Sequence, residues 1–321
     1  MPLSESYPTV SVPMSSDVKV AVADAKTLDG ALQLLRGESN GDQTAEDSLA
    51  GLASDDVISA SVETRVVGAV VSHAVAGRAG WIWPPVVGPS EGRSVVSAQI
   101  RQRLVAAATS KLAAAGCRVA QALLIPGDTR GQDLEASGFV LITEMIRMVR
   151  DCALRSDRTH DTGGLEFVSY EQATEREFEE VIEKTYRGSQ DCPELDGVRT
   201  VTEALESYKA TGSFRPDLWL LARQRGNWVG CVLLANSPVD CSCELQYMGV
   251  VPHARGQQIG RILCEQALMD ARRVGACKLI LSVDSRNRPA INHYSTMGFI
   301  ESERRRVHIL KLLPTGSTTR A

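Results

Sequence analysis

Hydrophobic residues along this chain occur in two patterns: short runs bounded by turn residues, and longer stretches that repeat with a helical period. Short apolar or alternating runs predict strands, and a period of about 3.6 residues predicts amphipathic helices. In the second half, the expected strands are 165–169, 218–223, 228–236, 243–251, 278–283 and 299–310, and the expected helices are 171–186, 198–210, 258–273 and 289–296. The Gly226-Asn227 pair is expected to form a hairpin turn.

The first half has a similar order of elements. It contains expected strands at 18–23, 80–87, 119–125 and 140–149, a hairpin over 57–74, and helices at 28–35 and 95–115. The longer helix repeats apolar side chains along one stripe, at Val96, Ile100, Leu104, Ala108 and Leu112. Two segments of similar order predict an internal duplication and a mixed α/β layer architecture.

A polar, aperiodic stretch that ends in Gly163-Gly164 separates the two segments. A chain of 321 residues also suits two domains better than one. We therefore expect a disordered leader at 1–16, a first domain at 17–150, a linker at 151–164, a second domain at 165–312 and a flexible tail at 313–321. The leader lacks the basic and apolar regions of a signal peptide.

The composition is that of a globular protein with a net charge of −4, which gives no electrostatic reason to expect nucleic acid as a partner. No apolar stretch approaches the ~20 residues of a membrane span, so no membrane partner is expected. The eight cysteines form no Cys-x-x-Cys pair. We therefore expect a cytoplasmic protein with reduced thiols and no metal site.

A turn that contains glycine carries the first chemical signal. A predicted strand ends at Pro252, and Arg255, Gly256 and Gly260 lie where a long helix begins. The free amides and the positive dipole end of a helix N-terminus form an anion site, and glycine lets a phosphate approach the backbone. Such turns also occur without a ligand, so the interpretation depends on the residues beyond this helix.

One strand later comes a second pattern, Asn-x-x-Ala-x-x-x-Tyr-x-x-x-Gly-Phe, which is matched at every spacing by Asn287, Ala290, Tyr294, Gly298 and Phe299. Together with the preceding Arg-x-x-Gly-x-Gly/Ala turn, this pattern resembles the GNAT superfamily of N-acetyltransferases. Gln258 replaces the middle glycine of the first pattern. The replacement is compatible with a phosphate loop if residue 258 takes ordinary helical torsions.

The resemblance implies the fold, the cosubstrate and the binding positions. Each half would be a GNAT-like domain, a mostly antiparallel twisted sheet flanked by helices, and acetyl-CoA would be the cosubstrate. The pantetheine arm would lie between the fourth and fifth strands, where one backbone amide would polarise the thioester carbonyl. The implied cofactor-binding residues are Met248, Gly249, Val250, Val251, Arg255, Gly256, Gln257, Gln258, Ile259, Gly260, Arg261 and Asn287.

Two residues are predicted to move protons during direct attack of an amine in a ternary complex. Tyr294 would protonate the departing thiolate, because a phenol with a pKa near ~10 is protonated at neutral pH. Glu244, on the strand that lines the acetyl site, is the candidate base. Simple packing beside Phe299 is the alternative for Tyr294, and a solubilising role on an edge strand is the alternative for Glu244.

The acceptor is expected to be a small-molecule or peptide amine, used by a monomer or a homodimer. Asp191 and Glu194, in the loop at 187–197, would suit a cationic amine, although an ordinary solvated loop would have the same composition. The second half is also similar, more loosely, to the mycothiol synthase family, which acetylates the amine of a cysteinyl pseudodisaccharide. That similarity implies Glu244 beside the acceptor and Tyr294 beside the thioester.

The first half lacks the residues of both patterns. Glu91 and Val96 stand where the second half has Arg255 and Gly260, and Leu134 stands in place of the tyrosine. A carboxylate would repel a diphosphate, so we expect a similar fold without catalysis. The alternative for the whole chain is a non-catalytic acyl-CoA-binding sensor or scaffold, which the presence of Asn287 and Tyr294 disfavours.

Overall fold

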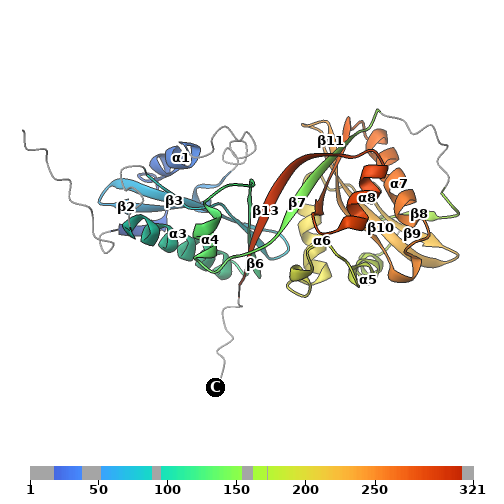
Figure 1. Ribbon diagram of the computed structural model, residues 1–321, viewed down its shortest axis with the longest axis horizontal. Helices are drawn as coiled ribbons and strands as arrows, with labels where there is room; N and C mark the ends of the chain where they lie inside the picture. The colour runs from blue at the N-terminus through green and yellow to red at the C-terminus, as the bar shows by residue number, and fades with distance from the viewer. Residues whose placement is uncertain (1–17, 38–51, 89–94, 154–161, 172, 313–321) are drawn as a thin grey trace, which may run out of the picture.

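The computed structural model describes residues 18–37, 52–88, 95–153, 162–171 and 173–312, which form two lobes joined by long strands (Figure 1). The first half contains β1 Val18–Val22, α1 Leu28–Gly37, η2 Ser54–Asp56, β2 Val57–Val62, β3 Arg65–Val75, β4 Ala79–Ile82, β5 Val86–Val87, α3 Val95–Ala114, β6 Val119–Leu124, α4 Gly131–Glu135 and β7 Val140–Asp151. The predicted leader and tail lie outside the described residues.

The second half contains β8 Glu166–Ser169, α5 Glu175–Tyr186, η4 Pro193–Leu195, α6 Val201–Ala210, η5 Pro216–Leu218, β9 Trp219–Gln224, β10 Asn227–Ser237, β11 Ser242–Val250, η6 Pro252–Ala254, α7 Ile259–Arg273, β12 Lys278–Asp284, α8 Arg288–Thr296 and β13 Ile300–Lys311. The predicted order of elements and the tandem mixed α/β fold are confirmed. The hairpin turn lies one residue earlier than expected, because Arg225 and Gly226 take the left-handed torsions.

The two halves share one continuous sheet. Its order is β1-β2-β3-β4-β6-β13-β7-β12-β11-β10-β9-β8, with β5 paired to β3. The last strand of the first half, β7, pairs with β12, and the last strand of the second half, β13, pairs with β6. Each half thus gives its final strand to the sheet of the other, an exchange that the hydrophobic pattern does not predict.

Helices cover both faces of the sheet in the second half. On one face, α7 packs Cys264, Ala267 and Leu268 into a core that also includes Tyr294 of α8. On the other face, α5 buries Phe178 in a separate cluster with residues of β9 and β10. This layering leaves the carboxyl ends of β11 and β12 between α5–α6 on one side and α7–α8 on the other.

The first half also supports α6 directly. Glu203 is 8% exposed, and its carboxylate accepts from Arg78 at 3.2 Å and from Arg118 at 3.0 Å. The β3–β4 turn lies so close that a Cβ at Gly77 would meet the carbonyl oxygen of Glu203 at 1.9 Å. An element of the expected acceptor region therefore rests on the other domain.

The expectation that all thiols are reduced is wrong for one pair. Cys241 and Cys277 form a disulfide, with their Cα atoms 5.3 Å apart. Cys241 precedes β11 and Cys277 precedes β12, and the parallel pairing of these strands brings together two residues that are 36 positions apart. Among the described residues, His, Cys, Asp and Glu side chains form no group of three that could hold a metal ion.

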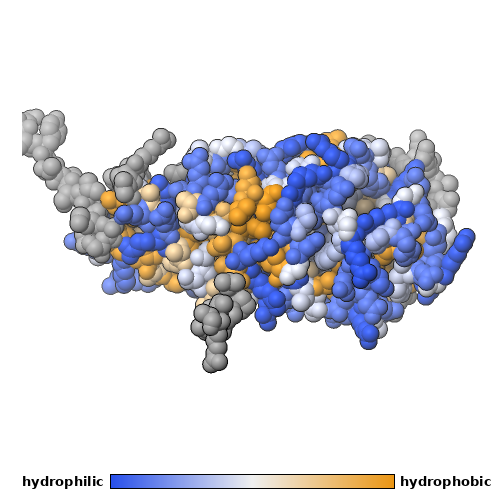
Figure 2. All heavy atoms as spheres, turned by 60° about the horizontal axis from the view of Figure 1, so that its bottom comes forward, coloured by the Kyte–Doolittle hydropathy of each residue, from blue (hydrophilic) through white to orange (hydrophobic). Residues whose placement is uncertain are grey.

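The surface seen in Figure 2 is mostly hydrophilic, with hydrophobic atoms gathered near the middle of the molecule. On β6 and β7 and beside them, Leu123, Ile125 and Val140 are exposed. Within the described part of the chain, no helix has the length and apolar character needed to cross a membrane.

Candidate active site

The central strands of the second half separate toward their carboxyl ends. β11 and β12 pair in parallel only as far as Leu245 and Leu281. Beyond these residues β11 continues to Val250 and β12 to Asp284, each still paired with the strand on its outer side. On the side toward β12, the backbone of residues 246–250 therefore faces an opening within the sheet, while its other side remains paired with β10.

A β-bulge marks the start of the opening. Tyr247 pairs with Leu233 and Leu245 pairs with Leu234, so that Gln246 is the extra residue on β11. A bulge bends its strand and interrupts the regular hydrogen-bond ladder. The Oε1 atom of Gln246 is buried without a hydrogen-bond partner in the structure.

The predicted pantetheine-binding residues line this opening. Met248 and Val250 contribute to the clusters that pack under α7, and Val251 is buried. A Cβ at Gly249 would meet the Thr185 side chain at 2.6 Å. The packing of β11 against α5 therefore explains the glycine at 249 without a ligand.

Backbone amides gather at the same end of the sheet. Gly256 and Gln258 both take left-handed torsions, with φ of +78° and +63°, and Gln258 is the N-cap of α7. The first amides of a helix lack partners within the helix and carry the positive end of its dipole. Gln257 and Gln258 are exposed beside this helix start, whereas Ile259 anchors it in the core.

The expectation of helical torsions at position 258 is wrong. Residue 258 takes a left-handed conformation, which a glycine would adopt without strain. A residue with a Cβ in this conformation costs roughly 1–2 kcal/mol relative to a right-handed one. Gln258 therefore stores strain at the start of α7.

Replacing Gln258 with glycine is expected to raise the free energy of unfolding by about 1 kcal/mol, because glycine adopts left-handed torsions freely. Urea denaturation would measure the change. Gln257→Gly is the matched control: residue 257 has no left-handed torsion, so this substitution should give no gain. Equal effects of the two substitutions would contradict the strain at position 258.

The Arg255 side chain turns away from the helix start. Its Nε donates to the Val250 carbonyl at 3.1 Å, and its terminal nitrogens donate to Thr185, Arg187 and Gly188 carbonyls at 2.9 to 3.3 Å. An arginine at these carbonyls also complements the negative end of the α5 dipole. Arg255 thus ties the predicted phosphate loop to the predicted acceptor loop.

Tyr294 lies on α8 and is 8% exposed. Its ring packs edge-on against Phe299, with the centroids 5.7 Å apart. Burial raises the pKa of the Tyr294 phenol above its ordinary value, so the hydroxyl keeps its proton throughout the neutral range. The packing alternative from the sequence is thus observed, while the acid role stays a prediction.

Asn287 is the N-cap of α8, and its Oδ1 accepts the Ala290 N–H at 3.2 Å. The other predicted catalytic residue, Glu244, is partly buried on β11 and pairs with Ala235 and Ile280. Glu244 precedes the bulge along the chain, in the part of β11 that is still paired with β12.

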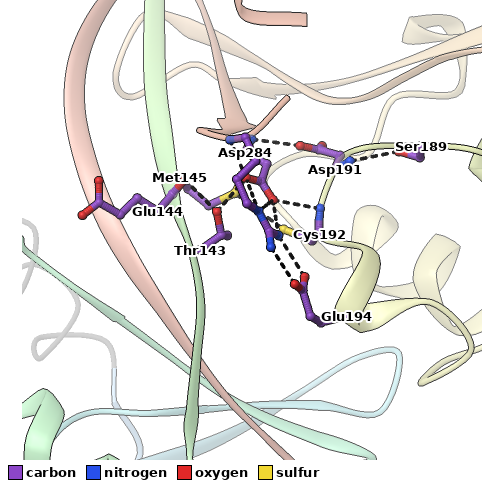
Figure 3. Close-up of polar contacts among 9 residues, drawn as sticks. Thr143, Glu144, Met145, Ser189, Asp191, Cys192, Glu194 and Asp284 are labelled. Atoms are coloured by element: carbon purple, nitrogen blue, oxygen red, sulfur yellow. Dashed lines mark hydrogen bonds and ion pairs between the residues drawn. The ribbon is translucent and has the colours of Figure 1, made fainter. Parts of the chain in front are cut away.

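The loop after α5 is fixed against the end of β12 (Figure 3). Asp284 is fully buried and accepts from Thr143 at 2.6 Å and from the Cys192 N–H at 3.1 Å. Arg286 bridges Asp284 and Glu194, and it donates to both Glu194 oxygens at 2.6 and 2.9 Å. The Glu194 carboxylate, a predicted substrate ligand, is therefore held by an arginine.

Burial acts against ionisation of Asp284, but hydrogen bonds from Arg286 and Thr143 outweigh it and hold the pKa at about 2. Neither Asp284 nor Arg286 was predicted as part of the site, and Thr143 comes from β7 of the first half. Asp284 and Arg286 come directly after the predicted strand at 278–283, which is only a weak sequence signal for a functional site. The contribution of Thr143 depends on the strand exchange and has no local signal.

A cavity of about 530 Å³ lies between α7 and α8, next to Gln258. Its basic side chains are Arg150, Arg261, Arg272 and His293. Burial lowers the pKa of His293 below its ordinary value, so three arginines supply most of the positive charge. Of these four residues, the sequence patterns indicated only Arg261.

In the first half, Leu134 is fully buried in α4, within the core beneath α3. Leu134 lies four residues before Gly138, just as Tyr294 of α8 lies four residues before Gly298. Glu91, the residue that the sequence comparison matches with Arg255, lies outside the described residues.

The comparisons relate the second half of the chain to one family. Residues 182–299 match the model of the Acetyltransferase (GNAT) family. The matched region begins within α5 and ends just before β13, so that it includes the opening, the turn before α7 and Tyr294.

Curated relatives match part of the chain, and two of them carry different names. The mycothiol acetyltransferase of Jonesia denitrificans is 39% identical over 88 residues, which is 27% of this chain and 27% of that protein. The IAA acetyltransferase of Azospirillum brasilense is 36% identical over 88 residues, which is 27% of this chain and 58% of that protein. The match thus spans about a quarter of the first relative and just over half of the second.

Solved structures extend the likeness to the whole fold. A GCN5-related N-acetyltransferase from Sphaerobacter thermophilus has a TM-score of 0.62 and 18% identity, over 95% of this chain and 98% of that one. A tandem GNAT protein from the clavulanic acid biosynthesis pathway has a TM-score of 0.54 and 14% identity, over 93% and 99%. At these identities the likeness concerns the fold, and the tandem GNAT architecture is confirmed.

Proposed function

We propose that this protein transfers the acetyl group of acetyl-CoA to a primary amine, in a ternary complex bound by the second half. The observation that carries the proposal is the opening between β11 and β12, which ends beside the amides at the start of α7. An extended thioester arm fits the opening, and a diphosphate fits the helix start. A backbone amide along residues 246–250 would polarise the thioester carbonyl.

Gly260 supports a ligand at the helix start. Its φ is not left-handed, and the nearest atom to an added Cβ would be Val250 Cγ2, at an ordinary contact distance of 3.9 Å. The fold itself would therefore accept alanine, although glycine within a helix costs about 1 kcal/mol relative to alanine. Close approach of a diphosphate to this backbone explains why a glycine is used.

The nucleotide end of the cosubstrate would lie toward the cavity between α7 and α8. Arg261 and Arg272 line this cavity and would offer positive charge to phosphate groups. Gln257, Gln258 and Ile259 would contribute backbone amides at the helix start. Asn287 would steady the cosubstrate from the start of α8.

Tyr294 would give its proton to the thiolate of CoA as the carbon–sulfur bond breaks. Glu244 would face the acceptor amine and is the base predicted from the sequence. The curated relatives carry two different acceptor names, so the proposal extends to a cationic or polar amine and not to a particular molecule. The first half would not catalyse, because the place of Tyr294 is filled by Leu134.

CoA release from acetyl-CoA tests this function across spermidine, an aminoglycoside, a cysteinyl conjugate and a peptide with a free N-terminus. We expect turnover with at least one amine. Tyr294→Phe should lower kcat roughly 100-fold through loss of the general acid, while the Kd for acetyl-CoA stays unchanged. Binding of acetyl-CoA without turnover of any amine would favour the sensor instead.

A further inference from the structure

Asp191 brings the acceptor loop to the mouth of the opening between β11 and β12. Its Oδ1 accepts the backbone N–H of Asp284 at 2.8 Å, and Asp284 is the last residue of β12. Pairing with β11 has already ended at Leu281. The Asp191 carboxyl group therefore lies at the end of β12, beyond the last residues that pair with β11; Figure 3 shows it beside Asp284.

The same carboxyl group lies near the helix that carries the proposed acid. Asn287, whose Oδ1 caps the N-terminus of α8, is a neighbour of Asp191. Tyr294 lies within electrostatic reach of Asp191. The carboxyl group of Asp191 therefore lies beside the N-terminal end of α8.

Asp191 differs from the acids around it. Glu194 and Asp284 are both held by Arg286, whereas among the described residues no arginine or lysine forms an ion pair with Asp191. Asp191 is also exposed to solvent, whereas Asp284 is fully buried. A solvent-accessible carboxylate without a cationic partner can accept a proton and pass it to water.

The loop backbone holds Asp191 in place. The Asp191 N–H donates to Ser189 Oγ at 3.2 Å, and the next residue, Cys192, takes a left-handed φ of +45° while its N–H bonds to Asp284. Left-handed torsions at a residue with a Cβ are strained, and they persist only where surrounding contacts enforce them. The contacts with β12 therefore fix the direction of the Asp191 side chain.

We propose that Asp191 is the general base that takes the proton of the acceptor ammonium; the assignment rests on the proposed acetyl transfer. The first ammonium proton passes to the Asp191 carboxylate and then to water. The amine nitrogen bonds to the thioester carbonyl carbon, and the carbon–sulfur bond breaks. The thiolate takes the Tyr294 proton, and the second proton on nitrogen restores the Tyr294 hydroxyl.

The charges around Asp191 suit this role. Its neighbours that titrate or carry charge are Asp284 at the end of β12, Arg286 after that strand, Tyr294 on α8, Tyr208 on α6 and Cys192 in its own loop. Although the residue is exposed, neighbouring protein atoms displace part of the water around the Asp191 carboxyl group. This desolvation, together with the negative charge of Asp284, raises the pKa of Asp191 above its ordinary value. A raised pKa makes a carboxylate a stronger base near neutral pH.

The test is the pH profile of kcat/KM for Asp191→Asn, measured with the panel amine that the wild-type protein acetylates. We expect about a 100-fold loss at neutral pH. The loss should shrink as the pH approaches the pKa of the amine, because the amine then loses its proton without a base. Asp196→Asn, an exposed acid of the same loop, is the matched control and should keep the wild-type profile.

A purely structural role predicts a different result, with the same loss at every pH. That outcome, or an unchanged profile, would overturn the assignment of Asp191 while leaving the acetyl transfer intact. Recovery at high pH in Glu244→Gln but not in Asp191→Asn would assign the base to Glu244 instead. Absence of wild-type turnover with every panel amine would overturn the proposed function and the role of Asp191 together.

Discussion

Gly260→Val is expected to reduce the affinity for acetyl-CoA by at least about 100-fold while leaving the fold intact. The valine side chain would project over the first amides of α7 and keep a diphosphate from reaching them. The protein itself has room at this position, because Val250 Cγ2 would lie 3.9 Å from a Cβ added to Gly260. Calorimetric titration with acetyl-CoA would measure the affinity, and thermal unfolding would report the stability.

Gly260→Ala separates a steric effect on the ligand from an effect on the helix. Alanine is the better helix former, by about 1 kcal/mol over glycine, and it adds only one carbon atom. We expect the alanine variant to unfold at a higher temperature and to retain much more of the acetyl-CoA affinity than the valine variant. Wild-type affinity in Gly260→Val would place the diphosphate elsewhere.

Asp284→Asn is expected to lower the free energy of unfolding by about 2–3 kcal/mol, because the buried donors that face the carboxylate lose their acceptor. Asp284 is fully buried and accepts hydrogen bonds from Arg286, Thr143 and the Cys192 backbone. An asparagine would turn an amide donor toward groups that are themselves donors. Urea denaturation at neutral pH would measure the loss.

The effect of this substitution should depend on pH in a defined direction. The folded-state pKa of Asp284, about 2, lies below its ordinary value of 3.8. The ionised carboxylate therefore contributes its full stability above about pH 4, and the contribution is lost as the pH falls toward 2. The difference between wild type and Asp284→Asn should shrink over that interval.

Thr143→Val provides a graded control, because it removes one hydrogen bond and keeps the ion pair. We expect a loss of about 1 kcal/mol, well below that of Asp284→Asn. A loss of equal size in the two variants would mean that the ion pair with Arg286 contributes nothing to stability. A stability difference between wild type and Asp284→Asn that stays constant from pH 4 to pH 2 would contradict the depressed pKa.

The local elements could be predicted from the sequence because their signals are local. The apolar stripe of α7 and the alternating residues of β11 repeat at the spacing of a helix and a strand. The short η elements and α4 were missed, because three to five residues are too few to show a period. The residues 80–87 were predicted as one strand but form β4 and β5, since Pro84 and Pro85 lie between them.

Only part of the candidate site could be predicted from local sequence signals. The turn before α7 and the spacing from Asn287 to Phe299 are continuous stretches of sequence, so a pattern could indicate them. The direction of the Arg255 side chain, the hold of Arg286 on Glu194 and the exposure of Asp191 depend on contacts between distant segments. Acidic residues in a loop look alike in a sequence until their partners are known.

The sequence by itself determined the order of helices and strands, the internal duplication and the two motifs of the second half. These features depend on residues a few positions apart, which fix backbone periodicity and turn geometry directly. Only the tertiary structure decided that β7 and β13 exchange places, that Thr143 supports Asp284, and that Cys241 meets Cys277. The physical reason is that two strands with the same alternation can pair in the sheet of either half, and the choice depends on the packing of the whole chain.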